Sequence, residues 1–232
     1  MQNKFIAASI IIIALVASIV TMLLTPLTHA QQSVIVPVAS GDTIIPQPVA
    51  SCDNPLVLID QTHGVSASFV PPDLVPLTDY GISVQDPSIE ARLDMVGELK
   101  SMLATMTSQG INVSVLSGYR SYTTQAGIDD GFQAPPGHSQ HQLGVAIDFT
   151  TNNPLYVQTG NFDATPAGKW LAQNAYKYGF YIAYPQGSEA ITGYNYEPWH
   201  YRYMGVATAL AMKQSGLLMQ IYLEKYGVLP DC

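Results

Sequence analysis

Basic side chains are scarce in this chain, and nothing in it repeats. Of 232 residues, nine are Lys or Arg and seventeen are Asp or Glu, which gives a formal net charge of −8. The few basic residues are scattered, so the sequence lacks the positive surface that binding to a nucleic-acid backbone requires. No block of like charge marks an interaction tail, and we find no internal repeat. The composition therefore argues against nucleic acid as a partner.

Polar residues are also scarce at the amino terminus. Lys4 precedes an apolar run over residues 5–24, and the small residues Thr28 and Ala30 suit the −3 and −1 positions of a signal-peptidase site. About twenty apolar residues can also span a bilayer, so an uncleaved anchor is the alternative. We expect residues 1–30 to be a signal peptide or a membrane anchor. Either one places the rest of the chain outside the cytoplasm, secreted or attached to the outer face of the membrane.

Only two cysteines are present, Cys52 and Cys232. They do not form a Cys-x-x-Cys pair, so the spacing argues against a thiolate zinc site. An even pair in an exported chain favours a disulfide, because oxidising compartments preserve such bonds and closing so long a loop restricts the unfolded chain strongly. Two free thiols are the alternative. We expect Cys52 and Cys232 to be bonded.

The chain divides into three parts by composition. After the leader at 1–30, residues 31–54 mix Val, Ile, Pro, Ser and Gln without a helical period, which is typical of an extended linker. Residues 55–232 have the length of one ordinary domain. We therefore expect one folded domain over 55–232.

Hydrophobic periodicity within that domain predicts both helices and strands. Helices are expected at 88–108, 165–178, 206–215 and 218–226, and strands at 56–59, 111–118, 145–149, 180–185 and 197–203. The short links between successive strands favour antiparallel pairing. The predicted fold class is α+β, with a small antiparallel sheet flanked by helices.

The stretch PGHSQHQLGVAIDF, residues 136–149, places His141 and Asp148 in an otherwise apolar, strand-like run. A buried unpaired carboxylate is costly, whereas a divalent cation stabilises a carboxylate and neutral imidazoles together. His200, in EPWHYRY, can supply a third ligand. Two imidazoles and one carboxylate leave a fourth tetrahedral position for water, which is the pattern of a catalytic zinc site.

Glu197, three residues before His200, is then the predicted general base, which takes a proton from water and hands it to the leaving amine. On a flat strand, His141 and Asp148 would face opposite sides, so we expect Gly144 to introduce a bend or bulge. On residue types alone, the alternative is a hydrogen-bonded core histidine and an aspartate paired with arginine.

Three blocks together resemble the signature motifs of the VanY-type zinc D-alanyl-D-alanine carboxypeptidases. They are SGYRS at 117–121 with Gln125, PGHSQH through Asp148 at 136–148, and EPWHY at 197–201, and the resemblance covers roughly residues 55–227. It implies the Hedgehog/DD-peptidase fold, a Zn²⁺ cofactor and removal of the C-terminal D-alanine from peptidoglycan stem peptides.

The resemblance also implies a role for each matching residue. Arg120 would face the scissile carbonyl or the substrate carboxylate, a role that suits its fixed charge. A structural salt bridge is the alternative for Arg120, and a plain turn residue for Ser139. The full set comprises the metal ligands His141, Asp148 and His200, the catalytic residues Glu197 and Arg120, and the substrate-binding residues Ser139, Gln125 and Ser117.

Two features depart from the family pattern. Gln140 stands where the motif usually has glutamate, and the segment 125–136 is short, which favours a more open site. The motifs do not separate D,D-carboxypeptidase from L,D-carboxypeptidase activity. A non-catalytic, zinc-stabilised wall-binding module is the rival from another class, and Glu197 argues against it because a binding module needs no base. His138 is expected to be structural or at the pocket rim, and His63 to be solvated.

Overall fold

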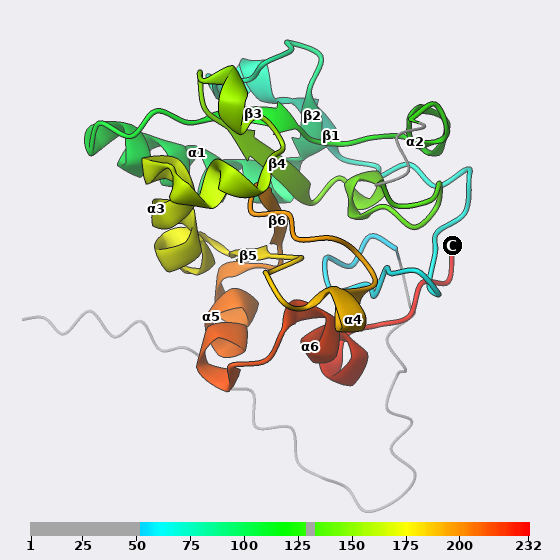
Figure 1. The fold of residues 1–232 in the computed structure, drawn as a ribbon. Coiled ribbons are helices and arrows are strands. Elements are labelled where there is room, and N and C mark those ends of the chain that lie inside the picture. Colours follow the sequence, from blue (N-terminus) through cyan, green and yellow to red (C-terminus); the bar gives the residue numbers. More distant parts are fainter. Residues whose placement is uncertain (1–51, 129–132) are drawn as a thin grey trace, which may run out of the picture. The chain divides into compact units, whose positions relative to one another are not determined.

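The structure, a computed structural model, describes residues 52–128 and 133–232 (Figure 1). The predicted leader at 1–30 lies outside the described residues, as does the predicted linker at 31–54 apart from its last three residues. Within the described ranges, no helix is both long enough and apolar enough to span a membrane.

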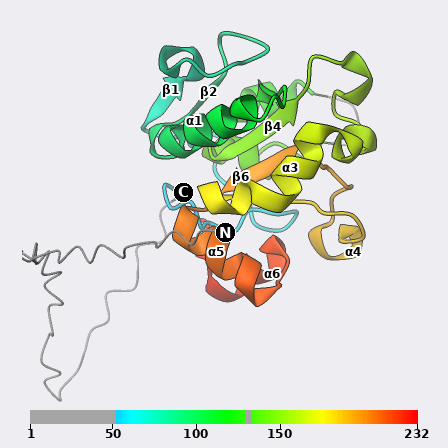
Figure 2. The same cartoon turned by 90° about the vertical axis from the view of Figure 1, so that its left-hand side faces the viewer.

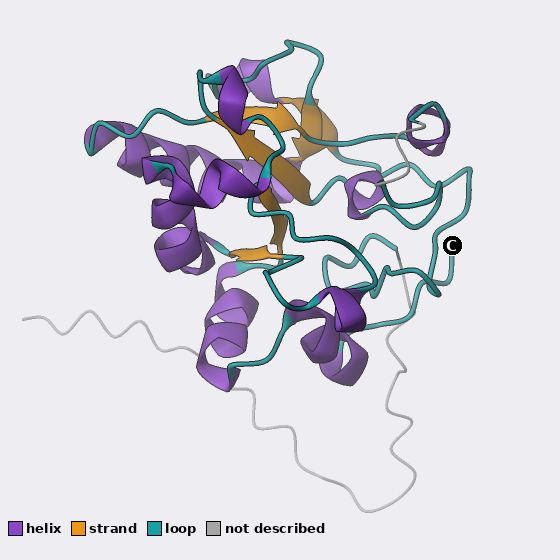
Figure 3. Ribbon diagram, in the orientation of Figure 1, coloured by secondary structure: helices purple, strands orange, loops and turns teal. Residues whose placement is uncertain are grey.

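A four-stranded antiparallel sheet lies at the centre of the fold (Figure 3). Its strands are ordered β3-β4-β6-β5, with bounds Ser114–Ser117 for β3, Ala146–Thr150 for β4, His200–Tyr203 for β6 and Phe180–Ile182 for β5. Every neighbouring pair is antiparallel. The expected α+β class, with a small antiparallel sheet flanked by helices, is confirmed.

Helices cover one face of this sheet and pack at its β5 end. In Figure 2, α1 (Leu93–Ser108) and α3 (Pro166–Asn174) both lie in front of β4 and β6. Helices α5 (Val206–Ser215) and α6 (Met219–Tyr226) lie together near β5. Two shorter helices are α2 (Tyr122–Ala126) and α4 (Glu189–Thr192).

The main hydrophobic core forms between the sheet and these helices. Alternate residues of the β4 segment, Val145, Ile147 and Phe149, are fully buried in the same cluster as Leu99 of α1 and Leu171 of α3. Because successive side chains of a strand face opposite sides, the residues between them, including Asp148, point away from this core. The core thus fixes the direction of Asp148.

The predicted helix at 88–108 begins later than expected. Residues Glu90–Arg92 form strand β2, which pairs antiparallel with β1 (Leu74–Pro76), and α1 starts only at Leu93. The Arg92 guanidinium pairs with Asp73, with Nε and Oδ1 3.0 Å apart. This pairing with a distant segment outweighs the helical period of the local sequence.

Both ends of the described domain are joined to each other. Cys52 and Cys232 form a disulfide with their Cα atoms 6.0 Å apart. Instead of the strand expected at 56–59, a single parallel bridge connects Val57 to Val228. Arg202 of β6 is fully buried and donates to the carbonyl oxygens of Pro55 and Val57, so the first residues of the domain are attached to the sheet.

Candidate metal centre

Two of the predicted ligands come from adjacent strands. Asp148 of β4 and His200 of β6 are direct partners in the antiparallel register. Their side chains meet with Asp148 Oδ1 and His200 Nδ1 3.0 Å apart, and both residues are buried. The sheet itself therefore sets the distance between these two groups.

A tight turn brings the third predicted ligand, His141, close to the other two. His141 lies on the 3-10 helix η2 (Gln140–Leu143), which begins after Ser139, whose Oγ accepts from the His141 amide at 3.3 Å. The helix ends at Leu143 and is capped by Gly144, which has a φ of 69°, a conformation that favours glycine. We expected either a bend or a bulge at Gly144, and the structure shows a bend. As a result, His141 Nε2 lies 3.3 Å from Asp148 Oδ1.

The outward nitrogen of each imidazole is held by a hydrogen-bond partner. His141 Nδ1 lies 2.6 Å from the carbonyl oxygen of Gly118, which can only accept, so Nδ1 carries the hydrogen and Nε2 carries a lone pair. His200 Nε2 lies 3.2 Å from Gln140 Oε1. When that nitrogen donates to the amide oxygen, His200 Nδ1 is left with the lone pair facing Asp148.

The three atoms that face one another, His141 Nε2, Asp148 Oδ1 and His200 Nδ1, are here called the inward atoms. One ligand atom from each residue can be chosen so that all lie within 4.8 Å of one another. Both His141 Nε2 and Asp148 Oδ1 are buried without a hydrogen-bond partner among the described residues. Acceptors that converge in this way fit a cation, and two imidazoles with one carboxylate fit zinc.

The protonation states suit a metal site. Burial lowers the pKa of His141 to about 4, assisted by the positive charge of Arg120 and opposed by Asp148. Burial alone would raise the pKa of Asp148, but its interactions with His141 and His200 hold it well below the usual range. A neutral imidazole and an ionised carboxylate are the forms that bind metal.

Glu197 lies beside the inward atoms in the turn before β6. Its Oε2 is 3.4 Å from His200 Nδ1, and its side chain keeps 17% of its surface exposed. The His200 amide donates to the Glu197 carbonyl at 3.1 Å, which closes the turn that contains Pro198. A carboxylate thus lies next to the inward atoms, as a general base requires.

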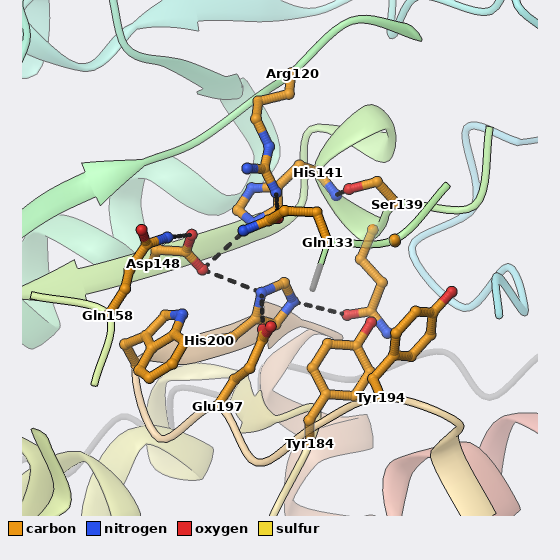
Figure 4. Close-up of a pocket in the computed structure, with 13 residues that line it drawn as sticks. Arg120, Gln133, Ser139, His141, Asp148, Gln158, Tyr184, Tyr194, Glu197 and His200 are labelled. Carbon is orange, nitrogen blue, oxygen red and sulfur yellow. Dashed lines mark hydrogen bonds and ion pairs between the residues drawn. The ribbon is translucent and has the colours of Figure 1, made fainter. Parts of the chain in front are cut away.

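Arg120 and a group of uncharged side chains complete a pocket over these residues (Figure 4). Arg120 points toward His141, and its Nη2 donates to Gln133 Oε1 at 3.2 Å. Thirteen residues line the pocket: Arg120, Gln133, Ala134, Ser139, Gln140, His141, Asp148, Gln158, Tyr184, Tyr194, Glu197, Trp199 and His200.

Two tyrosines form the wall opposite Arg120. The ring of Tyr184 lies 4.9 Å from those of His200 and Tyr194, measured between centroids. Burial, reinforced by the charge of Glu197, raises the pKa of Tyr184 well above its ordinary value, and burial raises that of Tyr194 to about 12. Both phenols therefore stay protonated, and the Tyr194 hydroxyl donates to the His138 carbonyl oxygen at 3.4 Å.

Of the three predicted substrate-binding residues, one lines the pocket and two do not. Ser139 lines the pocket, but Gln125 and Ser117 are not among its lining residues. Gln125 is 1% exposed and donates to the Ala134 carbonyl at 2.8 Å, whereas Ser117 is paired with Asp148 across β3 and β4. Substrate contacts of Gln125 and Ser117 stay predictions.

The remaining histidines stay apart from the inward atoms. His138 Nδ1 lies 2.6 Å from the Asp60 carbonyl oxygen, which indicates a structural contact. His63 was expected to be solvated; its side chain is 36% exposed, and its Nδ1 is 3.0 Å from Asp60 Oδ1. Gln133, Gln158, Tyr184 and Tyr194 were not foreseen, since they lie outside the three motifs and no periodicity or spacing marks them.

Comparisons with known proteins agree with this geometry. The sequence model of the family described as VanY, D-alanyl-D-alanine carboxypeptidase, matches residues 88–206. This range includes Glu197 and the three residues that carry the inward atoms. A Bacillus subtilis (strain 168) protein that carries the name Putative carboxypeptidase YodJ is 34% identical over 186 residues, spanning 75% of this chain and 68% of its own length.

Solved structures are similar as well. The LdcB LD-carboxypeptidase has a TM-score of 0.69 and 33% identity, covering 75% of this chain and 87% of that one. A vancomycin-resistance D,D-pentapeptidase VanY, solved with Zn(II), has a TM-score of 0.57 and 27% identity, covering 72% of this chain and 98% of that one. With the family match over 88–206, these findings establish that the chain belongs to the VanY family of D-alanyl-D-alanine carboxypeptidases.

Proposed function

We propose that this protein is an exported zinc carboxypeptidase that removes the C-terminal D-alanine from peptidoglycan stem peptides. The observation that carries the proposal is the convergence of three buried metal-binding side chains beside Glu197, in a chain of the VanY family. The donor set supports zinc, as does the Zn(II) in the related VanY structure.

His141, Asp148 and His200 would hold the zinc through their inward atoms. When bound, zinc supplies a Lewis acid that polarises the scissile carbonyl and makes water a nucleophile near neutral pH. Glu197 takes the proton from the attacking water and passes it to the leaving nitrogen of D-alanine. Its position at the pocket gives it access to both groups.

Arg120 supplies the positive charge that a carboxypeptidase needs for the terminal carboxylate of its substrate. Its Nε is buried without a hydrogen-bond partner in the described part of the chain, and its Nη2 is held by Gln133. A guanidinium held in this way can bind a carboxylate through two parallel hydrogen bonds. We assign it to the substrate carboxylate, with Ser139 as a further polar contact at the pocket.

An extracytoplasmic location follows from the proposed substrate, because peptidoglycan lies outside the cytoplasmic membrane. The disulfide between Cys52 and Cys232 supports the same location, since such bonds persist in oxidising compartments. Export through a signal peptide or an anchor at 1–30 is part of the proposal. The mass and the amino-terminal sequence of the protein isolated from cells distinguish cleavage after Ala30 from retention of the anchor.

L,D-carboxypeptidase activity on tetrapeptide stems is the second candidate, supported by the likeness to the LdcB LD-carboxypeptidase. The test is to incubate the zinc-loaded protein with a pentapeptide stem ending in D-Ala-D-Ala and with the tetrapeptide, and to weigh the products. Loss of one alanine from the pentapeptide is expected, and a chelator should abolish it. Loss from the tetrapeptide alone selects the second candidate. Binding of zinc and stem peptides with no cleavage selects the wall-binding module instead.

A further inference from the structure

Each of the three proposed ligands has one atom that points away from the metal position, and each of these atoms contacts an uncharged group. For His141 the contact is a backbone carbonyl, that of Gly118. For His200 and Asp148 the contacts are the side-chain amides of Gln140 and Gln158. These glutamines come from different parts of the chain, one before β4 and one after it.

We propose that Gln140 and Gln158 are positioning residues, which fix the atoms that His200 and Asp148 turn toward the metal. The inference rests on the zinc proposed for this site. It adds two residues to the ligands, base and arginine that the motifs identify. Partners of this kind orient ligands without touching the metal or the substrate's reacting atoms.

Gln140 acts on His200. The glutamine is 3% exposed, next to His141 on η2, and its Oε1 lies 3.2 Å from His200 Nε2. Donation from Nε2 to this oxygen holds the imidazole in the tautomer whose lone pair is on Nδ1, the nitrogen nearest Asp148. It also restrains rotation of the ring.

Gln158 acts on Asp148. Its Nε2 donates to Asp148 Oδ2 at 3.3 Å, whereas Oδ1 of the same carboxylate faces both imidazoles. Because Oδ2 is occupied by the amide, Oδ1 is the oxygen left for the metal. The contact therefore favours a carboxylate that binds through one oxygen and leaves coordination positions for water and substrate.

The backbone of Gln158 supports this role. With a φ of 45°, it is the one non-glycine residue with a positive φ in the described ranges 52–128 and 133–232. A glutamine in this region is unfavourable, and such conformations gather at functional sites. Gln158 is also exposed, so burial of an apolar side chain does not account for its position. The loop instead holds a conformation that directs an amide to the ligand.

The Gln140 test compares zinc affinity by chelator competition with unfolding of the metal-free protein. Gln140→Met has a similar length but its thioether accepts a hydrogen bond only weakly, so we expect zinc affinity to fall by about tenfold or more. Gln140→Glu keeps an acceptor and should retain or exceed wild-type affinity, although its buried charge lowers the stability of the metal-free protein. Equal zinc affinity in wild type and Gln140→Met would overturn the role of Gln140.

For Gln158, the informative variant is Gln158→Asn, which keeps the amide but is one methylene shorter. Asparagine tolerates positive φ better than glutamine, so the metal-free protein should unfold at the same temperature or higher. Zinc affinity should nevertheless fall by about tenfold, as in Gln158→Met. Gln173→Met, an exposed glutamine on α3, is the matched control and should bind zinc as wild type does.

Cobalt substitution separates positioning from general damage. If Asp148 gains freedom to bind through both oxygens, the visible absorption of the Co²⁺ protein should weaken in Gln158→Asn, because five-coordinate Co²⁺ absorbs less than four-coordinate Co²⁺. Unchanged affinity and an unchanged spectrum would overturn the role of Gln158 and leave the proposed function standing. A wild-type protein that neither binds zinc nor cleaves stem peptides would overturn both.

Discussion

Asp148 and His200 face each other as register partners across β4 and β6, and their side chains meet at 3.0 Å between Oδ1 and Nδ1. Two ligands are thereby held by hydrogen bonds of the central sheet. The third, His141, is brought to them by a short turn that ends in a glycine. The site therefore combines a rigid pair with one ligand whose position depends on local backbone conformation.

Replacing one member of the rigid pair should remove the metal. In His200→Ala, zinc content and hydrolysis of stem peptides should fall together, because two ligands hold zinc far less tightly than three. Zinc should also stop stabilising the fold, a contribution of about 2.7 kcal/mol when free zinc is at one hundred times the dissociation constant. Metal analysis and thermal unfolding with and without zinc check this. Full zinc occupancy in His200→Ala would remove His200 from the ligand set.

Glu197→Gln should separate catalysis from metal binding. The substitution preserves size and hydrogen-bonding capacity but removes the basic carboxylate, while the inward atoms stay in place. Zinc content and thermal midpoint should match wild type, whereas hydrolysis should fall by about 10² or more. Turnover and metal content are measured on the same sample. Near-wild-type turnover would mean that Glu197 is not the base, and loss of zinc would make it a ligand.

Local pattern predicted much of this architecture. A strand was predicted at 197–203, of which His200–Tyr203 form β6, and α5 occupies the predicted span Val206–Ser215. The predicted start of α1, at residue 88, was wrong because Ile89 and Leu93 continue the helical spacing through Glu90–Arg92. Only pairing with β1, fourteen or more residues earlier in the chain, makes that segment a strand. A local period cannot contain this information.

The residues of the site likewise divide into those that the sequence could predict and those that it could not. His141, Asp148, His200 and Glu197 were identifiable because few residue types bind zinc or act as a base. The outward partners of His141 and Asp148 were not, since a backbone carbonyl has no sequence signature and Gln158 lies in a loop that only the fold brings to Asp148. Residue chemistry therefore predicted the ligands, and the tertiary structure was needed for the groups that orient them.

Acid should destabilise the metal-free protein through His141. Burial lowers its folded-state pKa from 6.5 to about 4, so between these values the unfolded chain binds a proton that the folded protein does not. Stability therefore falls as pH drops from about 6.5 to about 4, by roughly 3 kcal/mol in total. Urea unfolding of the metal-free protein across this range measures the effect. His141→Gln should flatten the dependence, and an equally steep slope in that variant would assign it to other groups.

Gly144→Ala should disturb the turn that brings His141 to the site. The φ of 69° disfavours a side chain, and a Cβ would lie 2.9 Å from Arg92 Cγ and 3.0 Å from Leu74 Cδ2. We expect a loss of about 1–3 kcal/mol in unfolding free energy and weaker zinc binding. Gly97→Ala, on an exposed position of α1 with open space around the Cβ, is the control. It should stabilise by about 0.5–1 kcal/mol. Equal behaviour of the two variants would contradict the role of the turn.

The disulfide should contribute to stability and not to catalysis. Cys52 and Cys232 are 180 residues apart in sequence, so their bond restricts the unfolded chain over nearly the whole domain. Replacing both by serine should lower the free energy of unfolding by roughly 2–4 kcal/mol. Activity per folded molecule should persist, because neither cysteine lines the pocket. Denaturant unfolding of the oxidised protein and the double variant gives the first quantity, and turnover below the unfolding transition gives the second. Mass spectrometry of the exported protein under non-reducing conditions should find no free thiol, and two free thiols would disprove the bond.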